Sequence, residues 1–232
     1  MSDTPIDVFI DLPSFPGPVQ AGRLWSHFRK GRESASFEYN KEWLANPHRF
    51  ALEPLLPLAD GTFHTNPGQS VFGAIGDSTP DRWGRILMRR AELARARTAN
   101  ESPHTLSELD YLLRVNDEAR QGALRFSQDG GQSFCAPPGS TPIPPLVNLS
   151  RLLHAADHFC RDDENAEDLR LLLAPGSSLG GARPKASVKD KKGNLCIAKF
   201  PRYDDEYNVV AWEAVALTLA SKAGLQVPRF DL

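Results

Sequence analysis

Apolar and polar residues alternate along the first forty positions of the chain. Apolar residues stand at every second position from Ile6 to Leu12, with Asp7 and Asp11 between them, which is typical of a β-strand with one buried face. Residues 19–28 and 34–39 flank a polar turn and predict a β-hairpin. The chain is therefore expected to begin with a small antiparallel sheet.

A helical period replaces this alternation after residue 79. Thr79 can act as the N-cap, Pro80 as the first helical residue and Asp81 as a first-turn acid. At about 100° per residue, Trp83 and Leu87 fall on one side of the helix. Five arginines fall on another side: Arg82, Arg85, Arg89, Arg90 and Arg97. This basic side is either a solvated helix face or a surface for an acidic partner or nucleic acid phosphates.

The rest of the chain alternates between periodic segments and one irregular stretch. Periodicity predicts a short strand over residues 122–126 and helices over residues 105–115, 148–161 and 166–173. Residues 127–146 are rich in Gly, Pro and Ser, which is typical of a linker. We therefore expect an N-terminal subdomain over 1–127, a linker over 128–147 and a second domain over 148–232.

Composition and charge narrow the classes of function. With 232 residues, 41% of them apolar, the chain can form one large or two modest domains. A net charge of -2 provides no general attraction to nucleic acid or to anionic membranes, and no apolar run is long enough to span a membrane. Three scattered cysteines suit a reducing cytoplasm better than a disulfide framework. We expect a cytoplasmic protein.

Two histidines one helical turn apart, His154 and His158, could share a metal ion. They lack a Glu after the first His and a third ligand at suitable spacing, and a surface helix face explains them better. No metal ligand is therefore assigned to the chain.

The candidate chemistry lies in the segment Gly176-Ser177-Ser178-Leu179-Gly180-Gly181-Ala182-Arg183-Pro184-Lys185. Its glycines let backbone N–H groups turn toward one point and leave room for an anionic group such as phosphate. Residues 186–188 and 195–200 follow as two short apolar runs joined by a polar tip, which predicts a β-hairpin.

One lysine and one glutamate extend this hypothesis. Alternation places Lys199 on the same strand face as Leu195 and Ile197. Residues 208–223 predict a helix, and Glu213 lies on its apolar stripe. A buried carboxylate needs a cation, so we expect a buried pair with Lys199, whose loss costs more than that of a surface pair and about 3 kcal/mol if burial is complete.

Two simpler interpretations remain open. The glycine-rich segment could be only a turn, and Lys199 and Glu213 could be solvated surface residues.

Two other phosphate or nucleophile motifs are excluded by spacing. Gly176-Ser177-Ser178-Leu179-Gly180 matches a hydrolase nucleophile elbow, but that fold needs a later histidine and the last one is His158. A Walker A loop would require Lys and then Ser or Thr directly after Gly181.

Five short motifs in order carry a family resemblance. They are Gly22-Arg23-Leu24, Phe37-Glu38-Tyr39 with Trp43-Leu44, Pro80-Asp81-Arg82-Trp83-Gly84-Arg85, Gly122-Ala123-Leu124, and Ser178 to Lys185 with Lys199. Over about residues 22–227 the chain resembles the HipA family of bacterial serine/threonine kinase toxins of type II toxin–antitoxin pairs. The order of glycine-rich loop, strand lysine and helix glutamate is also that of a protein-kinase N-lobe.

The resemblance implies an α+β fold: a small antiparallel-sheet N-terminal subdomain with helices, followed by a kinase-like N-lobe made of a Gly-rich hairpin and a helix. It implies that Ser178 is an autophosphorylation site and that Glu213 orients Lys199. It also implies an ATP site formed by Gly180, Gly181, Ala182, Arg183, Pro184, Lys185 and Lys199. The implied partners are a HipB-type helix-turn-helix antitoxin, DNA reached only through that antitoxin, and an aminoacyl-tRNA synthetase as protein substrate, with no membrane.

One departure from the family pattern limits the expected activity. A kinase needs a C-lobe with a catalytic Asp and further Asp and Asn ligands for Mg²⁺, but only one carboxylate side chain, Asp231, follows Glu213. We therefore expect the C-lobe and its metal ligands to be missing, no catalytic residue in this chain, and no phosphate transfer by the chain alone. The rival hypothesis is a non-catalytic regulatory or antitoxin-like protein that binds a kinase lobe or a DNA-binding antitoxin.

Overall fold

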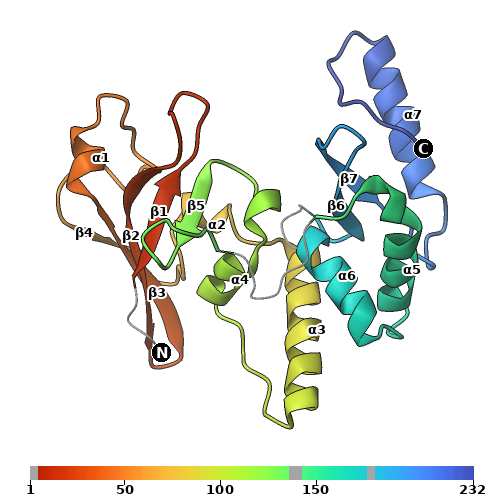
Figure 1. The fold of residues 1–232 in the computed structure, drawn as a ribbon, viewed down its shortest axis with the longest axis horizontal. Helices are drawn as coiled ribbons and strands as arrows, with labels where there is room; N and C mark the ends of the chain where they lie inside the picture. The colour runs from red at the N-terminus through yellow and green to blue at the C-terminus, as the bar shows by residue number, and fades with distance from the viewer. Residues whose placement is uncertain (1–4, 136–142, 177–180) are drawn as a thin grey trace.

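Two lobes lie side by side in the computed structural model, with helices between them (Figure 1). The structure describes residues 5–135, 143–176 and 181–232. One lobe is built on a five-stranded sheet, and the other combines a two-stranded sheet with helices. The fold is thus α+β with an antiparallel sheet and several helices, as the sequence predicted.

The first lobe is an antiparallel sheet with strand order β4-β3-β2-β1-β5. Its strands are β1 (Ile6–Ile10), β2 (Val19–Arg29), β3 (Arg32–Tyr39), β4 (Thr62–His64) and β5 (Leu124–Ser127). The predicted first strand, the hairpin and the short strand near residue 124 are confirmed. Gly22 permits the close pairing of β2 with β3, because a Cβ atom there would lie 2.2 Å from the Glu38 carbonyl oxygen.

Short helices cover this sheet: α1 (Lys41–Ala45), α2 (Gly73–Gly76), α4 (Glu108–Arg114) and a 3₁₀ turn, η1 (Asp117–Ala119). Large side chains such as Phe37, Trp43 and Phe72 are fully buried in one core with the strands. The Tyr39 hydroxyl bonds to the Leu56 carbonyl and accepts from the Leu52 amide, which fixes the irregular segment after α1.

The long helix α3 (Arg82–Ala99) begins two residues later than the sequence predicted. Asp81, and not Thr79, is the N-cap, because its carboxylate accepts hydrogen bonds from the Trp83 and Gly84 amides. The Thr79 hydroxyl instead donates to the Gly76 carbonyl. Pro80 therefore lies before the helix.

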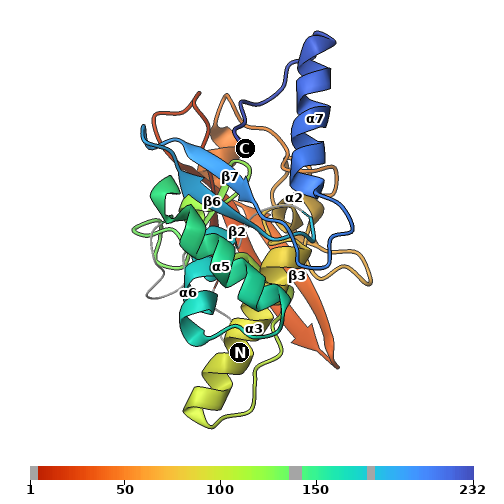
Figure 2. The ribbon, with the colours of Figure 1, turned by 90° about the vertical axis from the view of Figure 1, so that its right-hand side faces the viewer.

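The second lobe contains a hairpin and four helical segments. They are η2 (Leu146–Asn148), α5 (Leu149–Cys160), α6 (Ala166–Gly176), β6 (Lys185–Lys189), β7 (Leu195–Lys199) and α7 (Val209–Lys222). Leu152, Ala186 and Val188 are buried together with Trp83 and Leu87 of α3. Figure 2 shows α5 and α6 beside the hairpin, and α7 extending beyond it. The predicted helices and hairpin are confirmed.

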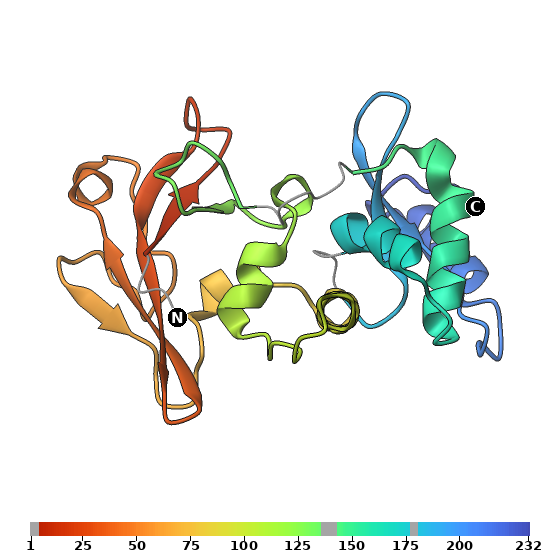
Figure 3. The same ribbon diagram turned by 60° about the horizontal axis from the view of Figure 1, so that its bottom comes forward.

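Contacts between α3 and α4 connect the two lobes (Figure 3). Arg85 of α3 forms a two-fold ion pair with Glu108 and lies over the Tyr111 ring at 4.6 Å. Glu33 at the tip of the β2–β3 hairpin accepts from the amides of Glu108 and Leu109. Arg85, one of the five arginines of the predicted basic face, thus pairs with Glu108 inside the protein.

No helix within residues 5–135, 143–176 and 181–232 is long and apolar enough to cross a membrane.

Glu92 is the single carboxylate within α3, and its pKa is strongly perturbed. It is 3% exposed and accepts hydrogen bonds from Arg95 and from the His104 amide, with Arg114 at 3.5 Å. The hydrogen bonds from Arg95 are the main cause that lowers its pKa from 4.5 to about 2. Its charge therefore stabilises the folded state above its unfolded pKa, and this contribution is lost as the pH falls toward about 2.

We predict that Glu92→Gln destabilises the protein at neutral pH by removing this charged acceptor. The difference in unfolding free energy between wild type and Glu92→Gln should shrink as the pH falls from about 4.5 toward about 2, because the wild-type carboxyl is then protonated. Urea unfolding of both proteins across this range measures the difference. A difference that stays constant with pH would contradict the assigned role.

Candidate functional site

Two lysines face each other at the open end of the β6–β7 hairpin. Lys185, the first residue of β6, pairs in register with Lys199, the last residue of β7. Side chains of directly opposed residues lie on the same face of the sheet. The turn is closed by Asp190, which accepts from the amides of Lys192 and Asn194. Hairpin pairing therefore concentrates two positive charges at one point.

A pocket of about 400 Å³ lies beside these lysines. This volume is within the range of small-molecule sites. Residues of three elements line it: Gly181, Ala182, Arg183, Pro184, Lys185, Ile197, Lys199, Phe200, Val209, Val210 and Glu213. The pocket thus joins the end of the glycine-rich segment, the hairpin and the first turns of α7.

The structure brings together most of the site residues that the sequence predicted. Gly181, Ala182, Arg183, Pro184 and Lys185 line the pocket with Lys199 and Glu213. Gly181 has a positive φ of 87°, a conformation that favours glycine. The predicted residues Ser178 and Gly180 lie outside the described residues.

The expected pair between Lys199 and Glu213 is present, but it is not buried. The Lys199 ammonium contacts the Glu213 carboxylate, and their side chains are 47% and 39% exposed. The reason is that α7 packs loosely: Ala214 is its only fully buried residue among those described, and Trp212 is 63% exposed. The predicted cost of about 3 kcal/mol for its loss is therefore too large, because water screens the pair.

Lys185 differs from Lys199 in being buried. Its side chain is 8% exposed, and its ammonium lies 3.8 Å from the Asp81 carboxylate at the start of α3. Burial lowers the pKa of Lys185 below its ordinary value of 10.5, and the neighbouring charge of Lys199 lowers it further, while Asp81 opposes the shift. Each lysine of the pocket thus has its own carboxylate, from a different helix.

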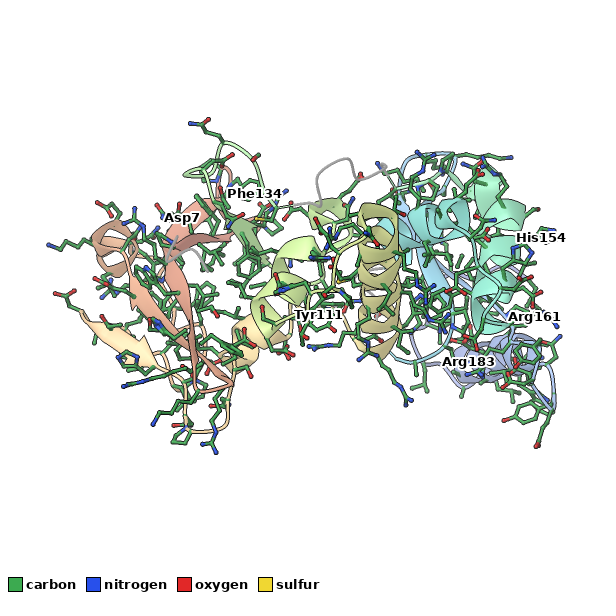
Figure 4. All side chains as sticks on the ribbon, turned by 90° about the horizontal axis from the view of Figure 1, so that it is seen from below. Asp7, Tyr111, Phe134, His154, Arg161 and Arg183 are labelled. Carbon is green, nitrogen blue, oxygen red and sulfur yellow. The ribbon has the colours of Figure 1, made fainter. Side chains whose placement is uncertain are left out.

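Arg183 holds the glycine-rich segment to the connection before α7. Its guanidinium donates to Asp205 at 2.7 Å, and the Arg202 amide donates to the same carboxylate. The hydrogen bond from Arg183 lowers the pKa of Asp205 below its ordinary value. Figure 4 shows Arg183 in the lobe that carries α5 and α7, far from Asp7 of the sheet. The Arg183 guanidinium thus lines the pocket, but its charge is already paired with Asp205.

Sequence reasoning missed the parts of the site that come from other segments. Asp81 was assigned only to the first turn of a helix, and Asp205 was given no role. Trp83 donates through its indole nitrogen to the Lys185 carbonyl at 2.9 Å, although the two residues are 102 positions apart. No local period could signal such contacts. The only hint was the tight motif around Asp81 and Trp83.

The two other candidate features have simpler explanations. His158 contacts Asp168 at 3.0 Å, a hydrogen bond that raises its pKa, and His154 is exposed on the outer side of α5 (Figure 4). A second pocket of about 380 Å³ lies between α3 and residues 162–169. Its Arg90 pairs with Asp162 and Glu164, and Arg97 lines it as well. The lysine pocket differs from it in adjoining the end of the glycine-rich segment.

We predict that Glu213→Ala lowers the unfolding free energy by less than about 1 kcal/mol, as for other exposed ion pairs. A double-mutant cycle with Lys199→Ala, measured by urea unfolding, isolates the coupling of the two side chains. Added salt should reduce this coupling further. A coupling near 3 kcal/mol would show that the pair behaves as a buried one.

Comparison with known protein families identifies both lobes. Residues 17–127 match the HipA N-terminal domain, and residues 177–232 match the HipA-like C-terminal domain. No curated protein matches the chain. The two matches together cover β2 to β5, α3, α4 and the lysine pocket, in the order that the motifs predicted, and leave β1, α5 and α6 outside. Proteins of this family are toxins that generally pair with a HipB antitoxin. The chain belongs to the HipA family.

Proposed function

We propose that the lysine pocket binds the phosphates of ATP, and that the chain is the nucleotide-binding part of a HipA-type serine/threonine protein kinase toxin. The observation that carries this proposal is the opposed pair Lys185 and Lys199, which share one pocket with the end of the glycine-rich segment. Paired cationic side chains beside a glycine-rich turn are a common solution for holding phosphates.

The contacts in the pocket suit separate parts of a nucleotide. Lys199 is held by Glu213 in the manner of the lysine–glutamate pair of kinases, which places an ammonium group on the phosphates. The backbone of residues 181–185 would supply further donors, and Ile197, Phe200 and Val209 offer an apolar wall for the base. In this proposal β6, β7 and α7 are the sheet and helix of a kinase N-lobe.

The transfer step needs groups that these residues do not offer. After Glu213 the sequence has one carboxylate side chain, Asp231. The described residues also contain no cluster of three His, Cys, Asp or Glu side chains that could hold a metal ion. We propose that these 232 residues bind nucleotide but do not transfer phosphate by themselves, and that the catalytic Asp and the metal ligands come from a further lobe.

Family membership supports further proposals about regulation and partners. Ser178, three positions before Gly181 in the sequence, would accept phosphate in the complete kinase and thereby control it. A HipB-type antitoxin would bind the chain and connect it to DNA, and an aminoacyl-tRNA synthetase would be the protein substrate. These assignments rest on the family and not on contacts in the structure.

One observation favours the second candidate, a non-catalytic interaction protein. Helix α7 exposes large apolar side chains, with Trp212 63% and Leu219 60% exposed, and such surfaces often contact other proteins. The two candidates differ in their dependence on Lys199. Lys199→Met should abolish the activity of a kinase reconstituted with its catalytic lobe, whereas an interaction protein would bind its partner unchanged.

We predict that Lys199→Met weakens ATP binding by about tenfold or more, because one charge-assisted contact to phosphate is lost. Isothermal titration of the 232-residue chain with ATP measures the change. Lys192→Met is the matched control, since Lys192 lies at the exposed tip of the same hairpin. Equal affinities of wild type and Lys199→Met would remove the lysine pocket as the ATP site.

We predict that the purified chain, given labelled ATP and Mg²⁺, transfers no stoichiometric phosphate to Ser178. The reason is the lack of a catalytic base after Glu213. Autoradiography with Ser178→Ala as the control checks this outcome. Stoichiometric labelling that disappears in Ser178→Ala would show that the chain is a complete enzyme.

A further inference from the structure

The first turn of α3 is bound to the end of the glycine-rich segment. The Trp83 indole donates to the Lys185 carbonyl at 2.9 Å, and the Trp83 amide approaches the Gly181 carbonyl at 3.3 Å. Trp83 itself is buried beside Phe159 in the hydrophobic core of the second lobe. The backbone that leads into β6 is therefore fixed from outside the hairpin, by a helix that begins in another part of the sequence.

The two carboxylate oxygens of Asp81 face different groups. Oδ1 accepts from the Trp83 and Gly84 amides at 3.1 and 3.3 Å and caps the helix. Oδ2 is buried and has no hydrogen-bond partner among the described residues, but it lies 3.8 Å from the Lys185 ammonium. Capping uses one oxygen only, and Asn or Ser would cap the helix equally well. The helix N-terminus also favours a negative charge, but neither the cap nor the helix dipole accounts for the second oxygen, which is buried and lies toward Lys185.

We propose that Asp81 is a positioning residue of the lysine pocket: its carboxylate holds the ammonium group of Lys185 where an anionic ligand is bound. That the ligand is a nucleotide rests on the proposed function, but the contact between Asp81 and Lys185 does not. The motif Pro80-Asp81-Arg82-Trp83-Gly84-Arg85 thereby acquires a role in the pocket. Asp81 sets the side chain of Lys185, and Trp83 sets its backbone.

The space around the Lys185 ammonium is also shaped by Gly181. A Cβ atom at Gly181 would lie 3.1 Å from Nζ of Lys185, so the absence of a side chain leaves the ammonium room beside the backbone. The long distance of 3.8 Å to Asp81 leaves it free to turn toward a phosphate without losing its counter-ion. The Lys185 ammonium thus has a counter-ion in Asp81 and can still donate hydrogen bonds to a ligand.

Few other charges act on Lys185. Lys199 of β7 repels it, while Glu213 of α7 pairs with Lys199. Arg183 lines the same pocket and is paired with Asp205. The ion pairs of α6, which packs against β6, are directed to α5: Glu167 to Arg151 and Asp168 to His158. Asp81 is therefore the carboxylate that faces Lys185 directly.

Asp81→Asn tests the proposal because it keeps the cap and removes the charge. Without this carboxylate, the pKa of Lys185 should fall below its wild-type value, since only burial and Lys199 then act on it. NMR titration of lysines labelled at Cε, with Lys185→Gln to assign the signal, measures this without any ligand. Glu108→Gln is the matched control: it removes a carboxylate that pairs with Arg85 of the same motif, and it should leave Lys185 unchanged.

Binding of inorganic triphosphate supplies the second readout. While Lys185 is charged in both proteins, two effects of Asp81→Asn oppose each other: the ammonium loses the carboxylate that positions it, and the ligand loses a repelling charge. The ratio of the two Kd values at neutral pH is therefore the reference. Between the two pKa values only the variant has lost its ammonium, so the ratio of Kd (variant over wild type) should rise above its neutral value, by up to about tenfold, as the pH is raised toward the ordinary lysine value of 10.5. In a Lys185→Gln background this pH-dependent ratio should vanish.

The outcomes separate the inference from the proposed function. An unchanged Lys185 titration in Asp81→Asn, or a Kd ratio that is constant with pH, would reduce Asp81 to a helix cap and overturn the inference. A lowered Lys185 pKa together with no binding of triphosphate or ATP by wild type would overturn the proposed function and support the contact between Asp81 and Lys185.

Discussion

Two like charges placed opposite each other in a β-hairpin are the constraint on which the pocket depends. Lys185 and Lys199 repel each other across the strands, and such pairs destabilise a sheet unless each charge is compensated. The compensation comes from two helices, through Asp81 of α3 and Glu213 of α7. Because these helices lie at different sides of the hairpin, each lysine is drawn to its own carboxylate and both remain beside the same pocket.

The same constraint explains why α3 belongs to both lobes. Its first turn holds the end of the glycine-rich segment, and Leu87 enters the second core. On its other side Met88 packs against Tyr111 of α4, and Arg85 pairs with Glu108. Helix α3 therefore contacts both the pocket and the helix α4 that packs on the N-terminal sheet.

Local patterns predicted what local interactions determine. The alternation after Ile6, the period of the later helices and the polar tip of the hairpin all identified their elements, because burial of one face requires those periods. The choice of Asp81 over Thr79 as N-cap was missed, since both side chains cap well. Burial of the Lys199–Glu213 pair was wrong because an apolar stripe does not reveal whether anything covers it. The contacts of Asp81 and Trp83 with Lys185 join distant segments and leave no local signal.

The most direct test of the account is a structure of the chain with a non-hydrolysable ATP analogue. We expect the ammonium groups of Lys185 and Lys199 to lie within hydrogen-bonding distance of phosphate oxygens, each still beside its own carboxylate. An analogue bound elsewhere, or phosphates that contact neither lysine, would contradict the claim that this hairpin forms a phosphate site.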